Sequence, residues 1–97
     1  MEFKREDSLK IRFVIPDRPT VRQQMAYFSE ATGTNSTTHL ERLWLGARTL
    51  IQEWECDLFK HDVDLDDVND PQITDAMLWV AVQVRGYLNK LNELPKN

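Results

Sequence analysis

Residues 38–58 read THLERLWLGARTLIQEWECDL and give the strongest structural signal in the chain. Apolar side chains recur here at steps of three or four positions, at Leu40, Leu43, Trp44, Ala47, Leu50, Ile51, Trp54 and Leu58. This spacing is typical of one face of an amphipathic helix. Thr38 and Glu41 have the spacing of a capping box, so the sequence predicts a helix over residues 38–60. Gly46 lowers the helix propensity by ~1 kcal/mol relative to alanine, which suggests close packing against a neighbouring element.

A third helix is predicted over residues 70–92. Asp70 is a favourable N-cap and Pro71 suits the first helical position. The expected inner face consists of apolar residues at helical spacing: Ile73, Met77, Val80, Ala81, Val84, Leu88 and Leu91. Further apolar side chains, including Leu78, Trp79 and Val82, make this helix apolar on more than one side. A helix of that kind is central to the fold or has a second partner.

The chain before residue 38 predicts one shorter helix and one strand. Thr20 and Gln23 form a second capping-box pattern, which starts a helix over about residues 20–32. Val21, Met25 and Phe28 fall on one face of that helix.

Apolar residues alternate over residues 8–15, which indicates a half-buried strand, whereas residues 1–7 are charged and are expected to be frayed. A single strand needs a partner, which is either another short N-terminal segment or the edge of another subunit. The expected fold is therefore mainly α: three helices with a short N-terminal β-strand in one small α+β domain, residues 1–97.

Composition limits the classes of function. Twelve basic and sixteen acidic residues give a formal charge of −4, which argues against generic nucleic-acid binding. The charge is uneven, since residues 1–48 carry +2 and residues 49–97 carry −6. No apolar run approaches the roughly 20 residues that span a bilayer, and the start of the chain does not resemble a signal peptide. One cysteine, Cys56, excludes an internal disulfide and is compatible with the cytoplasm.

No motif for catalysis, cofactor binding or metal binding is complete. The acidic segment from Asp62 begins like a calcium-binding EF-hand loop, but Asp67 stands where glycine is needed and Ile73 where a bidentate glutamate is needed. Cys56 and His61 are too few ligands for a closed zinc site. Neither a nucleophile elbow nor a phosphate-binding glycine loop occurs. We therefore expect a protein that is not an enzyme and that has no cofactor.

Protein–protein contact is the remaining expectation. Apolar residues that fall off the main helical stripes are the candidate interface: Leu45, Phe59, Leu78, Trp79 and Val82. Trp79 is the strongest candidate because tryptophan is favoured at interface hot spots and this one lies on the wide side of its helix.

The layout resembles the small tail assembly chaperones of long-tailed bacteriophages. The resemblance is carried by IPDRPTVRQQMAYF over residues 15–28, RLWLGA over residues 42–47 and IQEWE over residues 51–55. It continues in DPQIT over residues 70–74, LWVA over residues 78–81 and the ending LPKN over residues 94–97.

The resemblance implies a protein of the infected bacterial cytoplasm that is absent from the mature virion. It implies binding to the tape-measure protein, which is kept soluble during tail assembly, contact with the tail-tube protein, and possible homo-oligomers. It implies no nucleic-acid or membrane partner. The alternative is a small acidic inhibitor or adaptor that occludes a basic site on a host protein, with residues 53–75 as its surface.

Overall fold

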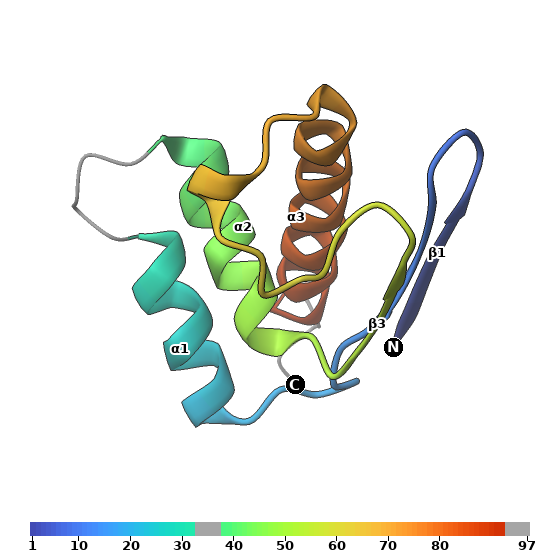
Figure 1. The fold of residues 1–97 in the computed structure, drawn as a ribbon. Coiled ribbons are helices and arrows are strands. Elements are labelled where there is room, and N and C mark those ends of the chain that lie inside the picture. The colour runs from blue at the N-terminus through green and yellow to red at the C-terminus, as the bar shows by residue number, and fades with distance from the viewer. Residues whose placement is uncertain (33–37, 93–97) are drawn as a thin grey trace.

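A computed structural model describes residues 1–32 and 38–92 of the chain (Figure 1). The elements in chain order are β1 (Glu2–Glu6), β2 (Lys10–Val14), α1 (Val21–Ala31), α2 (His39–Leu50), β3 (Glu53–Cys56), the 3₁₀ turn η1 (Leu65–Asp67) and α3 (Pro71–Asn92). The small, mainly helical α+β fold is confirmed. The ending LPKN, one of the segments that carry the resemblance, lies outside the described residues.

The three strands form one antiparallel sheet in the order β1-β2-β3. Phe13 on the central strand pairs with Phe3 on one side and Trp54 on the other. Successive side chains point to opposite faces of a strand, so these three rings share the face that packs on the helices. The Phe3 and Phe13 rings are stacked with centroids 4.9 Å apart. The opposite face carries charged residues, including Arg12 on the central strand.

The prediction that residues 1–7 are frayed is wrong. Residues 2–6 form β1, which pairs along its whole length with β2, and the Met1 carbonyl accepts a hydrogen bond from the Ile15 amide at 3.0 Å. Phe3 is the only apolar side chain of this strand, so its sequence lacks a clear apolar alternation. Of the two partners considered for the predicted strand, the N-terminal segment is the one observed.

The predicted helix over residues 38–60 is too long, because α2 ends at Leu50. The chain turns at Ile51, and the Gln52 amide donates to the Val14 carbonyl at 2.7 Å, which begins the pairing of β3 with β2. Trp54 and Cys56 then face the core as alternate residues of a strand. The spacing of Trp54 from Leu50 also fits a helix, so periodicity alone does not separate the two states.

The predicted N-cap residues are all observed, although of the two predicted capping boxes only the one in α1 has both hydrogen bonds. Thr20 and Gln23 form a reciprocal capping box at the start of α1. Thr38 accepts a hydrogen bond from the Glu41 amide at 3.2 Å at the start of α2. Asp70 accepts from the Gln72 amide at 2.9 Å, and α3 runs from Pro71 to Asn92 as expected.

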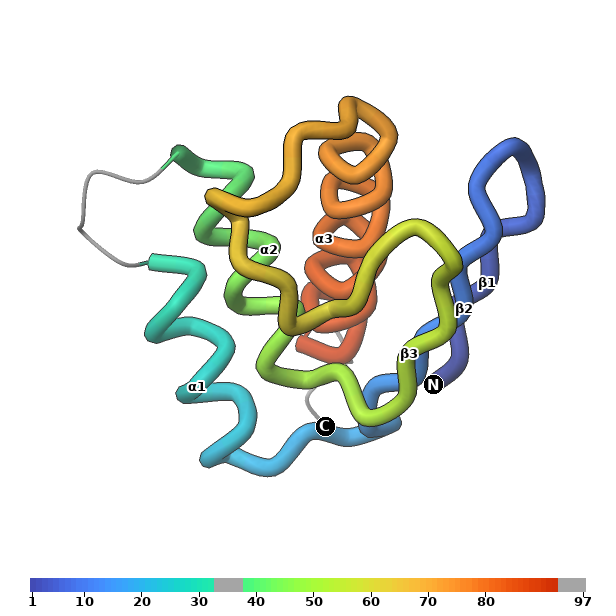
Figure 2. Tube along the Cα trace, in the orientation of Figure 1, coloured from blue at the N-terminus to red at the C-terminus, as the bar shows by residue number. Residues whose placement is uncertain are grey.

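The core lies between the inner face of the sheet, α2 and α3. Its largest fully buried side chains are Trp44, Phe13, Ile15, Leu50, Val80 and Val84. Figure 2 shows α2 between α1 and α3, and the Cα atoms span 46 × 33 × 17 Å, so the molecule is flat. Because of this arrangement, α1 lies at one side of the domain and packs on α2.

The contact between α1 and α2 is close at one point. A β-carbon placed on Gly46 would lie 3.0 Å from the Tyr27 carbonyl oxygen and 3.2 Å from the Ala31 β-carbon. Gly46 therefore lets the two helices approach each other, as its position in the sequence suggested. Within the described residues, no helix is long and apolar enough to cross a membrane.

Candidate protein-interaction surfaces

Two exposed apolar residues of α3, Leu78 and Val82, form the centre of the first candidate surface. They lie one helical turn apart and are 46% and 54% exposed. A different set of α3 residues packs into the core. These buried residues are Ile73, Ala76, Met77, Val80, Ala81, Val84 and Leu88. Leu78 and Val82 were predicted as interface residues, and the structure leaves both accessible.

Trp79 lies next to them and is half-buried. Its ring packs edge-on against Phe13 with centroids 5.8 Å apart, so part of the indole belongs to the core. The remaining part lines a shallow groove of about 470 Å³ together with Leu78 and Val82. Trp79 therefore connects the exposed pair to the core, and we call these three residues the α3 surface.

Charged residues of the β1–β2 hairpin close one side of that groove. The Arg5 guanidinium contacts the Asp7 carboxylate at 3.0 Å and the Asp75 carboxylate of α3 at 3.1 Å. The hydrogen bond with Asp7 raises the pKa of Arg5 above its ordinary value. Hydrogen bonds from the Leu9 amide and from Arg5 lower the pKa of Asp7. These ionised groups tie the hairpin to α3 and give the apolar surface a polar border.

The second candidate surface is a stripe on α1 formed by Val21, Met25 and Phe28. These side chains are 73%, 66% and 44% exposed. Among the eleven residues of α1, Tyr27 alone is buried. The sequence placed the three on one helix face, but it did not identify that face as an interface. Helical spacing is the same for a stripe that faces the core and one that faces solvent, so no sequence signal separates the two.

The two other predicted interface residues are less accessible. Leu45 is partly buried and packs against the core. Phe59 is buried, so its predicted place on an exposed helix face is wrong. The reason is that α2 ends at Leu50, and Phe59 lies in the segment after β3. Its ring packs against Trp44 and Trp54, and its carbonyl accepts the Trp54 Nε1–H at 3.0 Å.

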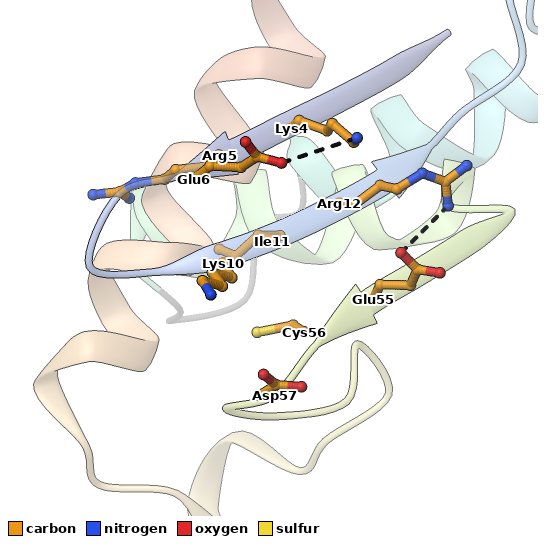
Figure 3. Close-up of a pocket in the computed structure, with 9 residues that line it drawn as sticks. All are labelled: Lys4, Arg5, Glu6, Lys10, Ile11, Arg12, Glu55, Cys56 and Asp57. Atoms are coloured by element: carbon orange, nitrogen blue, oxygen red, sulfur yellow. Dashed lines mark ion pairs between the residues drawn. The ribbon is translucent and has the colours of Figure 1, made fainter.

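The charged outer face of the sheet is a third feature of the surface. A hollow of about 550 Å³ lies at the hairpin end of the sheet. Figure 3 shows Lys4, Arg12 and Glu55 among the residues that line it. Arg12 contacts Glu2 at 2.9 Å and lies 3.8 Å from Glu55. The hydrogen bond with Glu2 raises the pKa of Arg12. Lys4 lies 4.0 Å from Glu6, so both Lys4 and Arg12 already have carboxylate neighbours on this face.

The described residues contain no cluster of three or more His, Cys, Asp or Glu side chains that could hold a metal ion. Cys56 is a free, half-buried thiol on β3.

No protein family, curated protein or solved structure matches the chain.

Proposed function

We propose that this protein is a binding domain that covers amphipathic helices of a client protein, and that it acts as a tail assembly chaperone on a bacteriophage tape-measure protein. The observation that carries the proposal is the set of five exposed apolar side chains on the α3 surface and the α1 stripe. None of these five side chains belongs to the core. The resemblance of the sequence to tail assembly chaperones supplies the identity of the client.

The exposed side chains suit a helix-in-groove contact, in which apolar residues of a client helix pack against apolar residues of the domain. Complete burial of one such side chain contributes ~1.5–3 kcal/mol, so covering five half-exposed ones supplies roughly 4–8 kcal/mol. Association costs about as much again, at ~4 kcal/mol or more. A single contact is therefore weak.

Weak contacts suit a chaperone on a long helical client. Many copies that bind neighbouring segments of one client gain affinity through multivalency, while each copy is still able to dissociate. Dissociation is required if tail-tube subunits are to replace the chaperone around the tape-measure protein. The domain would act in the cytoplasm of the infected cell and would leave before the virion is complete.

The test is co-expression with the tape-measure protein encoded in the same genome, followed by affinity capture and size-exclusion chromatography. The proposal predicts a soluble client that elutes with many copies of this chain. The variants Leu78→Ser with Val82→Ser, and Val21→Ser with Met25→Ser and Phe28→Ser, should each lower the captured amount several-fold. Ala26→Ser, an exposed change on α1 outside the stripe, is the matched control and should have no effect.

Salt separates this proposal from the acidic-inhibitor alternative. Apolar contacts persist or strengthen at high ionic strength, whereas contacts between surface charges are screened. Capture that persists in ~0.5 M salt supports the chaperone proposal. An insoluble client, with this protein eluting alone, would remove the main support for it.

A further inference from the structure

A groove of about 360 Å³ lies between the start of α2, the segment around η1 and the start of α3, and it is separate from the two surfaces above. Its apolar lining comes from all three segments and includes Leu40, Trp44, Val68, Ile73 and Met77. Trp44, Ile73 and Met77 are buried core residues, so the inner wall of the groove is held in place by the fold itself.

One polar group of this wall has no partner. The Trp44 side chain is 1% exposed, and its Nε1–H has no hydrogen-bond acceptor among the described residues. A buried N–H without an acceptor lowers the stability of the fold, so almost all such groups in proteins have a hydrogen-bond partner. Trp54 shows the contrast, because its Nε1–H donates to the Phe59 carbonyl at 3.0 Å. The Trp44 Nε1 atom is itself shielded from solvent, so the indole belongs to the fixed apolar wall of the groove and is not a contact for an occupant.

The rim of the groove has one sign of charge. Glu41, Asp66 and Asp70 line it, whereas no lysine, arginine or histidine does within residues 1–32 and 38–92. None of the three carboxylates forms an ion pair with another described residue. Asp70 uses one oxygen to cap α3, whereas Asp66 lies exposed. Glu41 and Asp70 lie at helix N-termini, which stabilise their charge, but none of the three carboxylates has a described cationic side chain as partner. Their negative charge around an apolar wall favours an occupant that is both cationic and apolar.

We propose that this groove binds a basic amphipathic peptide segment of a partner protein. An apolar side chain of the peptide packs against Trp44, Ile73 and Met77, while lysine or arginine side chains on either side of it meet the carboxylates of the rim. The site does not depend on the client proposed above, since it uses different residues and adds charge selection to apolar contact.

The first test is calorimetric titration of the full chain with two synthetic helical peptides of ~18 residues, which is five helical turns. Both peptides carry leucine at the same positions, and the remaining positions are lysine in one and glutamate in the other. The lysine peptide should bind at least about tenfold more tightly, and its dissociation constant should rise between ~0.05 M and ~0.5 M salt. Equal affinity for the two peptides would overturn the proposal.

Two variants locate the site. Asp66→Asn with Asp70→Asn removes two rim charges and keeps the N-cap of α3, because asparagine caps as well as aspartate. It should raise the dissociation constant of the lysine peptide about fivefold to thirtyfold, which corresponds to ~1–2 kcal/mol for two charge pairs. Asp57→Asn with Asp62→Asn removes the same charge from exposed positions outside the groove and should change it less than about twofold. An equal loss in both variants would mean that net charge, rather than the groove, attracts the peptide.

A third variant separates this site from the α3 surface. Leu78→Ser with Val82→Ser should leave the affinity for the lysine peptide unchanged if the groove is the site. If that variant abolishes binding while the Asp66 and Asp70 changes do not, the groove proposal is wrong and the α3 surface binds the peptide. Circular dichroism of each variant checks that the fold is retained.

Discussion

The helices α1 and α3 both carry apolar residues at helical spacing, yet they use them differently. Seven residues of α3 are buried, whereas in α1 only Tyr27 is. The α3 helix contacts the core along much of its length, and the Tyr87 hydroxyl donates to the Asp17 carbonyl at 2.6 Å. The α1 helix packs mainly on α2 and leaves its apolar stripe in solvent. The stability of the domain therefore depends more on α3, while α1 leaves apolar side chains accessible.

The largest expected difference comes from making the same change in each helix. Val84 on α3 is fully buried and Val21 on α1 is 73% exposed. Val84→Ser should lower the free energy of unfolding by ~2–4 kcal/mol, because it leaves a cavity and buries a hydroxyl. Val21→Ser should change it by no more than ~0.5 kcal/mol. Urea denaturation followed by circular dichroism measures both, and similar losses would contradict the assigned roles of the two helices.

A smaller difference is expected from two glycines. In Gly46→Ala the new β-carbon lies 3.0 Å from the Tyr27 carbonyl oxygen, so α1 must shift. This shift should lower the free energy of unfolding by ~1–3 kcal/mol. The higher helix propensity of alanine, ~1 kcal/mol, offsets part of that loss. At Gly86, by contrast, a β-carbon meets nothing within 4 Å.

Gly86→Ala should therefore stabilise the protein by ~0.5–1 kcal/mol through helix propensity. Thermal denaturation of the two variants compares them directly. A Gly46→Ala variant as stable as Gly86→Ala would mean that the α1–α2 contact is looser than the structure has it.

The smallest effect concerns alkaline pH. Burial raises the pKa of Tyr27 above its ordinary value of 10.0, because desolvation disfavours the phenolate. Stability is then fully present below pH 10 and is lost as the pH rises through the folded pKa, since the unfolded chain gives up this proton first. The melting temperature should fall as the pH rises above about 10, and Tyr27→Phe should reduce that fall. A variant with the same pH dependence as the wild type would exclude Tyr27 as its source.

The sequence predicts α3 and the central strand well, because each carries a clear period and clear end signals. Asp70 and Pro71 start α3 as expected, and the alternation around Ile11 and Phe13 places β2. These elements are specified locally, so sequence reasoning finds them.

Sequence reasoning fails where pairing across the fold decides the outcome. β1 has a single apolar residue and exists because β2 pairs with it, while β3 replaces helical turns because Gln52 and Trp54 reach β2. The predicted interface residues likewise include some that the sequence placed correctly and one that it did not. Leu78 and Val82 were predicted and are exposed, whereas Phe59 is buried by a turn that the sequence did not reveal. The α1 stripe was missed because exposure depends on which neighbours pack against a helix.

The most direct test of the proposed role of α1 and α3 is amide hydrogen exchange of this protein, free and bound to the co-expressed tape-measure protein. The account predicts that exchange slows in α1 and around Leu78 to Val82 when the client binds, because the client covers these exposed segments. It also predicts little change in β2, which the fold already protects. A complex that forms while exchange in α1 and in that part of α3 stays the same would contradict the assignment of the exposed apolar residues to client binding.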